Sequence, residues 1–342
     1  MKRRGFTLIA SMVIMATVFT MSFLSSCEGP AGVPGQDANE TCIQCHNDET
    51  TVLAAMVQHS NSGHQTGSSF ERNGTSCAPC HTHQGYLEIL ATGEQMTASD
   101  VSNPLPANCR TCHKIHENFD ESDFELRNTS PVTLWINSEE VDLGTGNQCV
   151  DCHQPRIPDP MPEMGGGNVT ITSSRWGPHH GTQSSMLWGT AGYEVAGSES
   201  FNSPGSHPHT SAGCNTCHMA EPFGAFAGGH SFSMSYEYHG RETEHLAGCQ
   251  GCHQNIEEFD LNGASSEVET LMADLWAILL SNEYVDDESG LVNASSSTPL
   301  VIPSDHAGAI LNYYMVIEDG SMGVHNPKYT KALLTNSIEV FN

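Results

Sequence analysis

The residues with the clearest chemistry are six repeats of the pattern Cys-x-x-Cys-His. Two thiols at this spacing can form thioether bonds to two vinyl groups on one edge of a porphyrin, and the imidazole that follows can then ligate the iron. The pattern therefore predicts six covalently bound c-type haems and their iron ions. The predicted thioether cysteines are Cys42, Cys45, Cys77, Cys80, Cys109, Cys112, Cys149, Cys152, Cys214, Cys217, Cys249 and Cys252. The predicted proximal ligands are His46, His81, His113, His153, His218 and His253.

Zinc is the competing interpretation, because Cys-x-x-Cys pairs also build zinc sites. It explains neither the histidine after every pair nor the export signal described below. The six motifs use all but one of the 13 cysteines. We therefore expect no disulfides, and a fold that is held together by covalently attached haem instead.

The second axial ligand of each iron decides the class of function. An iron with two protein ligands transfers electrons, whereas an iron with an open position can bind and transform small molecules. The chain has 19 histidines, so about two candidates remain for each second position after the proximal ligands are assigned. Two-histidine coordination of every iron is feasible, and no catalytic residue is predicted.

The remaining cysteine, Cys27, ends an N-terminal export segment. A basic start at Arg3 and Arg4 precedes an apolar run over residues 6–24, and Leu24-Ser25-Ser26-Cys27 resembles the lipobox of bacterial lipoproteins. We expect residues 1–26 to be a lipoprotein signal peptide, Cys27 to be lipidated, and the Gly- and Pro-rich residues 27–40 to form a tether. The alternatives are a membrane-spanning anchor, a prepilin-like leader and twin-arginine export.

Composition points to an unusual interior and to an acidic surface. Of 342 residues only 37% are hydrophobic and 32 are glycine, so a conventional core should be thin. The formal net charge is −28, which argues against nucleic acid and favours basic proteins or cations as partners. Adaptation to salt would produce the same surface.

The pattern of elements places most regular structure near the C-terminus. We expect residues 41–342 to form one haem-binding domain in which short helices carry the motifs, with a hairpin within 128–146 and a glycine loop before 169–171. Apolar spacing predicts a helical region over about 264–342. We expect one helix at about 266–282, a second that follows an N-cap at Ser304 and reaches Ile317, and a third from Pro327 after a cap at Asn326.

Several stretches carry a family resemblance. They are Ser62-Gly63-His64, Cys112-His113-Lys114-Ile115-His116, Gly177-Pro178-His179-His180-Gly181-Thr182-Gln183, Gly228-Gly229-His230-Ser231-Phe232 and Asp319-Gly320-Ser321-Met322-Gly323-Val324-His325-Asn326-Pro327. The chain resembles the multihaem c-type cytochromes of extracellular electron transfer, and is most similar to outer-membrane hexahaem members, including those that form filaments. The resemblance implies a mostly irregular and helical fold with a haem-packed core, little sheet and a small C-terminal helical region.

The resemblance also implies which histidines complete the coordination. The distal candidates are His64, His116, His179, His209, His230 and His325, with His180 and His207 as alternatives to His179 and His209, and with His59 and His83 in reserve. Which distal histidine serves which haem is left open.

The predicted function is electron transfer through six haems by a lipid-anchored protein of the cell envelope, at the outer membrane or surface of a Gram-negative bacterium. Its expected partners are periplasmic or outer-membrane redox proteins and extracellular acceptors, with self-association into oligomers or filaments as a variant. The alternative is a multihaem oxidoreductase of the nitrite, hydroxylamine or tetrathionate type with one open haem. All six motifs end in histidine and none in lysine, which favours the carrier.

Overall fold

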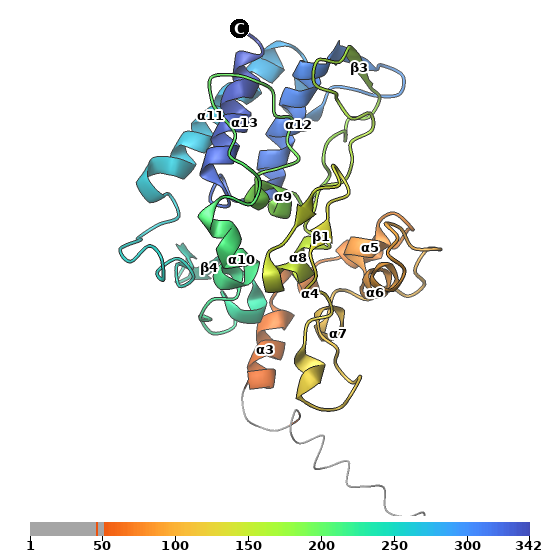
Figure 1. Ribbon diagram of the computed structural model, residues 1–342, viewed down its shortest axis with the longest axis vertical. Coiled ribbons are helices and arrows are strands. Elements are labelled where there is room, and N and C mark those ends of the chain that lie inside the picture. The colour runs from red at the N-terminus through yellow and green to blue at the C-terminus, as the bar shows by residue number, and fades with distance from the viewer. Residues whose placement is uncertain (1–45, 47–50) are drawn as a thin grey trace, which may run out of the picture. The chain divides into compact units, whose positions relative to one another are not determined.

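The computed structural model describes residue 46 and residues 51–342 (Figure 1). The predicted signal peptide, the tether, Cys27, Cys42 and Cys45 lie outside the described residues. By their contacts, residues 51–118 and 122–342 belong to one compact unit, and His46 and residues 119–121 belong to another. The larger unit holds all the strands and, apart from Glu121, all the helices of the described residues.

The first part of this unit consists of short helices separated by turns. They are α3 (Thr51–Ser60), α4 (Gly63–Thr66), η1 (Ser69–Glu71), α5 (Ala78–His81), α6 (His83–Thr92), α7 (Cys109–Cys112), η2 (Glu121–Phe124), η3 (Gly144–Gly146) and α8 (Asn147–Val150). The predicted hairpin is confirmed as β1 (Val132–Thr133) paired antiparallel with β2 (Glu140–Val141). The expectation of a mainly helical and irregular chain with little sheet is also confirmed, since each sheet of the described residues has only two strands.

The two longest helices of this part carry no Cys-x-x-Cys-His motif, and neither do α4, η1, η2 and η3. The expectation of short helices that carry the motifs was therefore wrong there. Helix α3 and helix α6 each have ten residues. The Thr82 side chain caps α6 by accepting from the Gly85 N–H at 2.9 Å, and Gly93 ends the helix with φ of +76°. These are ordinary start and stop signals that the sequence contained.

The middle of the chain connects the motifs to the C-terminal helices. Its elements are β3 (Asn168–Ile171), α9 (Gln183–Trp188), α10 (Pro208–His218), η4 (Gly229–Ser231), β4 (Ser235–Tyr238), β5 (Arg241–Glu244) and η5 (Leu261–Gly263). Strand β3 follows the predicted glycine loop and pairs antiparallel with β8 (Leu300–Pro303), far along the chain. This long-range pairing ties the middle of the chain to the C-terminal region.

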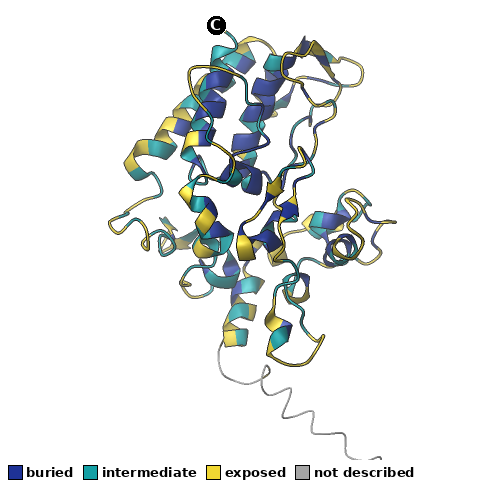
Figure 2. Cartoon of the chain, in the orientation of Figure 1, coloured by how far each residue is buried: buried dark blue, intermediate teal, exposed yellow. Residues whose placement is uncertain are grey.

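Three helices at the C-terminal end lie side by side (Figure 1). They are α11 (Ala264–Ser281), α12 (Ser304–Asp319) and α13 (Pro327–Glu339), with β6 (Val285–Asp286) and β7 (Leu291–Val292) between α11 and β8. Helix α11 buries Val268, Met272, Leu275 and Leu279 on one face, as the apolar spacing predicts. Most of α12 is buried (Figure 2), because neighbours cover it on several sides.

The apolar core is larger than composition suggested. One cluster of buried side chains runs from Val132 in β1 through Met186 in α9 to Leu334 in α13. The C-terminal helices therefore share their core with the hairpin and with α9. Burial at about 25 cal/mol per Å² makes such a cluster a main contributor to stability.

The helix starts in this region were predicted with mixed success. Asn326 caps α13 as expected, with its side chain accepting from the Tyr329 N–H at 3.2 Å, and Pro327 occupies the first helical position. Ser304 is not the N-cap of α12, which is Pro303. Because β8 leads directly into the helix, Ser304 already lies inside it and its hydroxyl donates to the carbonyl oxygen of Glu163 at 2.6 Å.

None of the helices within the described residues is long and apolar enough to cross a membrane.

Gly308 provides a test of this packing. A methyl group at Gly308 would lie 2.2 Å from Cδ1 of Tyr193, whose hydroxyl donates to Asp305 at 2.5 Å. Alanine normally stabilises a helix interior relative to glycine by about 1 kcal/mol. We expect Gly308→Ala instead to lower the free energy of unfolding by about 1–2 kcal/mol, because the held ring cannot move away. Denaturant titration of the haem-loaded protein followed by circular dichroism measures this.

The matched control is Gly167→Ala, since no atom lies within 4 Å of the added methyl group there. Its free energy of unfolding should change by less than about 0.5 kcal/mol. A Gly308→Ala protein as stable as the unaltered chain would contradict the packing described for α12.

Candidate haem sites

Each described Cys-x-x-Cys-His motif forms a turn of helix or ends one. In four motifs the histidine N–H donates to the carbonyl oxygen of the first cysteine, four residues earlier. The donor residues and distances are His81 at 3.2 Å, His113 at 2.9 Å, His153 at 2.9 Å and His253 at 2.8 Å. The remaining described motif closes α10, which ends at His218. A single turn places residues three and four positions apart on one face, so both thiols and the imidazole can serve the same group.

Five of the six predicted proximal imidazoles lie beside a second imidazole from a distant segment. The ring centroids are separated by 6.0 Å for His64 and His153, 6.3 Å for His81 and His179, 6.2 Å for His113 and His230, 6.2 Å for His209 and His253, and 6.3 Å for His218 and His325. A metal–imidazole bond is about 2 Å long and the ring centre lies about 1 Å further back, so two imidazoles on opposite sides of one ion have centroids about 6 Å apart. The pairs therefore have the spacing that a shared metal ion requires.

Hydrogen bonds orient several of these rings. Nδ1 of His113 lies 2.6 Å from the carbonyl oxygen of Phe124, Nδ1 of His218 lies 2.9 Å from that of Phe232, and Nδ1 of His209 lies 2.9 Å from that of Val324. A carbonyl oxygen only accepts, so Nδ1 must carry the proton and Nε2 keeps its lone pair. Nε2 is then free to bind a metal, as in other metal-ligating histidines.

Desolvation keeps several of the paired rings neutral. Burial, and next the neighbouring His180, lowers the pKa of His179 to about 4. Burial also lowers the pKa of His81 and that of His230. Because a metal binds the neutral imidazole, this environment suits ligation at neutral pH.

The alternative distal candidates have other contacts. Nδ1 of His180 lies 2.5 Å from a carboxylate oxygen of Glu318, and Nδ1 of His83 lies 2.9 Å from the Thr111 hydroxyl. The His207 ring accepts from the His209 N–H at 3.3 Å, at the start of α10. His59 lies in the last turn of α3, and burial lowers its pKa. Geometry alone thus favours His179 over His180 and His209 over His207.

The first motif is not described except for His46, so the role of His116 stays a prediction. His116 has φ of +66°, and its N–H donates to the Asp123 carboxylate at 2.7 Å.

The motifs touch one another through their thiols. The sulfur atoms of Cys80 and Cys152 lie close together, as do those of Cys149 and Cys214. The backbone of Gly248 packs against Cys217, where an added methyl group would lie 2.7 Å from Cα. The second motif therefore lies next to the fourth, the fourth next to the fifth, and the fifth next to the sixth.

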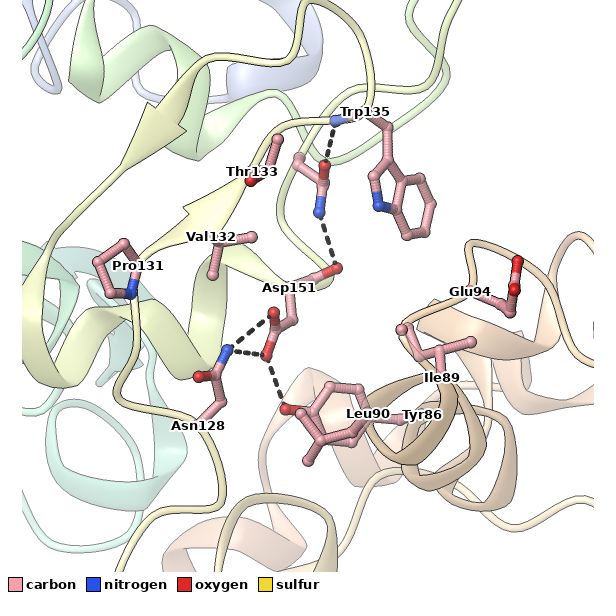
Figure 3. A pocket seen from close by; sticks show the side chains of 12 residues that line it. Tyr86, Ile89, Leu90, Glu94, Asn128, Pro131, Val132, Thr133, Trp135 and Asp151 are labelled. Atoms are coloured by element: carbon pink, nitrogen blue, oxygen red, sulfur yellow. Dashed lines mark hydrogen bonds between the residues drawn. The ribbon is translucent and has the colours of Figure 1, made fainter.

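Asp151, between the two cysteines of the fourth motif, anchors that motif to α6 beside a pocket (Figure 3). Its carboxylate accepts from Asn128 at 2.9 Å and from the Tyr86 hydroxyl at 2.8 Å. The same hydroxyl accepts from Gln148 at 2.6 Å. Burial raises the pKa of Tyr86 well above its ordinary range, so the phenol stays a donor.

The C-terminal end of α12 supports two neighbouring sites. Gln183 lies between them, with its Oε1 accepting from Nδ1 of His153 at 3.1 Å and its Nε2 donating to the carbonyl oxygen of Glu318 at 2.8 Å. Asp319 accepts from Nδ1 of His325 at 2.6 Å. Sequence reasoning missed the roles of Gln183 and Asp319, although both stand at ends of the stretches that carried the family resemblance.

Buried polar atoms without a partner accompany the sites. Within the described residues they are Ser184 Oγ, Trp188 Nε1, Asn202 Oδ1, Asn215 Oδ1 and His245 Nε2. Asn215 lies inside the fifth motif, and His245 comes shortly before the sixth. Since buried polar groups normally have partners, these atoms fit a bound group with polar edges, as haem has in its propionates.

Comparison with known proteins supports the same group. No family model matches the chain. The C-type polyheme cytochrome OmcB, from two strains of Geobacter sulfurreducens, is 23% identical over 381 aligned positions that cover 89% of this chain and 48% of the relative. The chain thus spans about half the length of the curated relatives it matches. The crystal structure of the outer cell wall cytochrome OcwA is 19% identical with a TM-score of 0.45, covering 83% of this chain and 50% of that one. The sequence likeness confirms the resemblance to multihaem c-type cytochromes, with haem c as the cofactor.

Tyr86 allows a test of the contact between α6 and the fourth motif. Tyr86→Phe removes a donor from the Asp151 carboxylate and an acceptor from Gln148, and Tyr86 is 2% exposed. We expect the free energy of unfolding to fall by about 1–3 kcal/mol, because unsatisfied buried polar groups remain. Tyr238→Phe is the control, since that side chain is 52% exposed and its loss should cost less than about 0.5 kcal/mol. Equal effects of the two changes in denaturant titrations would refute the anchoring role of Tyr86.

Proposed function

We propose that this chain is an electron carrier that holds six c-type haems, each with two histidine ligands. The observation that carries the proposal is the set of five imidazole pairs whose centroids lie 6.0–6.3 Å apart. In each pair one ring belongs to a Cys-x-x-Cys-His motif and the other comes from a distant segment. Bound haem supplies a reversible one-electron couple.

The ligand assignment follows from the pairs. His81 and His179 would hold the haem of the second motif, His113 and His230 that of the third, and His64 and His153 that of the fourth. His218 and His325 would hold the haem of the fifth motif, and His209 and His253 that of the sixth. With both axial positions filled, small molecules have no access to the metal, which favours electron transfer over substrate chemistry.

The adjacency of the motifs supports a relay. Thiol contacts join the second motif to the fourth and the fourth to the fifth, and Phe232 lies near three of the sites. Its ring centroid is 5.0 Å from that of His64 and 6.0 Å from that of His230, and its carbonyl oxygen accepts from Nδ1 of His218. Groups attached at such adjacent points can exchange electrons directly.

The place of this relay is the cell envelope, with Cys27 as a lipid anchor. The lipobox-like stretch before Cys27 supports export and lipidation, and the name of the structural relative OcwA places that protein in an outer cell wall. We propose extracellular acceptors, with basic redox proteins as partners because of the net charge of −28. Self-association into oligomers or filaments is a variant.

Neighbouring histidines give the sharpest test of the ligand assignment. We expect His179→Ala to convert one haem of six from low-spin to high-spin, because His81 would lose the partner imidazole that lies 6.3 Å away. His180→Ala should leave every haem low-spin, since that ring contacts Glu318 instead. The measurements are the haem content of each protein, low-temperature electron paramagnetic resonance (EPR) of the oxidised form, and carbon monoxide binding to the reduced form.

Two outcomes would contradict the proposal. A high-spin haem that binds carbon monoxide in the unaltered protein would favour the multihaem oxidoreductase with an open position. A high-spin haem in His180→Ala but not in His179→Ala would reverse the assignment of these two residues.

The anchor is tested separately. Cys27→Ser removes the thiol that is acylated in a lipoprotein, so the haem-loaded protein should leave the membrane fraction and lose incorporation of labelled palmitate. Retention of the Cys27→Ser protein in detergent-soluble membranes would instead indicate that residues 6–24 span the membrane.

A further inference from the structure

The hydrogen bonds to the paired imidazoles differ in one respect. Three Nδ1 atoms donate to backbone carbonyl oxygens and that of His153 donates to the neutral amide of Gln183. His325 is the exception among the described pairs, because its Nδ1 lies 2.6 Å from a carboxylate oxygen of Asp319. The Asp319 side chain is 1% exposed, so solvent does not screen its charge.

The position of Asp319 is unfavourable for helix stability alone. It is the last residue of α12, where the helix dipole disfavours negative charge. Two hydrogen bonds stabilise its carboxylate, one from Nδ1 of His325 and one from the hydroxyl of Ser321.

A carboxylate that accepts from Nδ1 makes the imidazole a stronger electron donor through Nε2. A stronger donor stabilises ferric over ferrous iron, and a buried negative charge acts in the same direction. Second-shell hydrogen bonds of this kind are among the means by which proteins set haem potentials.

We propose that Asp319 is a potential-setting residue, which makes the site of His218 and His325 more reducing than the adjacent site of His64 and His153. This inference rests on the proposed haem ligation. The difference in potential arises at the end of α12. Asp319 accepts from His325 through a charged carboxylate, whereas Gln183, which is bound to the same helix end, accepts from His153 through a neutral amide. Reduction adds one electron to the site, and the proton stays on Nδ1 of His325.

The test is an EPR-monitored redox titration of the full haem-loaded protein. His325→Ala first identifies the low-spin signal of this site, because that signal should become high-spin. In Asp319→Asn, which keeps an oxygen acceptor and removes the charge, the midpoint potential of the identified signal should move to a more positive value. Its low-spin g values should move as well, because the imidazole becomes a weaker donor.

Glu318→Gln is the matched control. It removes the same charge from the preceding residue, whose carboxylate contacts His180 rather than a paired ring, so the identified signal should move less than in Asp319→Asn. Equal shifts in the two variants would mean that only the general charge of the helix end matters, and would overturn the role of Asp319.

Ser321→Ala provides an effect of opposite sign. Removing the Ser321 hydroxyl takes one donor from the Asp319 carboxylate, so the carboxylate should accept more strongly from His325 and the potential should become more negative. This variant decides the matter if Asp319→Asn does not retain its haem. An unchanged or more positive potential in Ser321→Ala would then refute the proposal.

Failure of the underlying function has a separate signature. If His325→Ala leaves every low-spin signal in place, His325 is not a ligand, and both the ligation and the inference fall. If His325→Ala removes one low-spin signal but Asp319→Asn and Ser321→Ala do not move its potential, the ligation stands and the role of Asp319 falls.

Discussion

The structure depends above all on pairs of imidazoles that distant segments hold about 6 Å apart. A Cys-x-x-Cys-His turn is local and forms wherever the residues stand, but the second ring of a pair must come from elsewhere. His113 and His230, for example, are brought together across a large part of the chain. Each pair thus closes a long loop, and the entropy lost in doing so has to be recovered from the interactions that hold the two segments together.

The C-terminal helices supply the rigid support for two of these pairs. Helix α12 is buried along much of its length, and its last two residues hold His180, His325 and, through Gln183, His153. A side chain that starts from a packed helix is positioned more precisely than one on a loop. The packing around Met315 and Leu334 therefore fixes the position of α12, and the end of α12 in turn orients the rings of the candidate haem sites.

Local signals predicted the parts of the fold that local physics controls. The apolar spacing of Val268, Met272, Leu275 and Leu279 was sufficient for α11, and the cap at Asn326 was sufficient for the start of α13. The pairing of β3 with β8 carries no such signal, because strand partners are selected by the rest of the fold. For the same reason Ser304 was misread: its environment is set by β8 and Glu163, which a local pattern does not contain.

The sequence by itself indicated the cofactor, the number of motifs and the candidate proximal residues, because thioether attachment needs only residues that are neighbours in the chain. It also narrowed the distal candidates to a few histidines. Tertiary structure alone decided that His179, rather than His180, lies beside His81 and that Nδ1 of His325 donates to Asp319. Adjacent residues have the same local sequence, so only the folded position of α12 and of the opposing motif distinguishes their side chains.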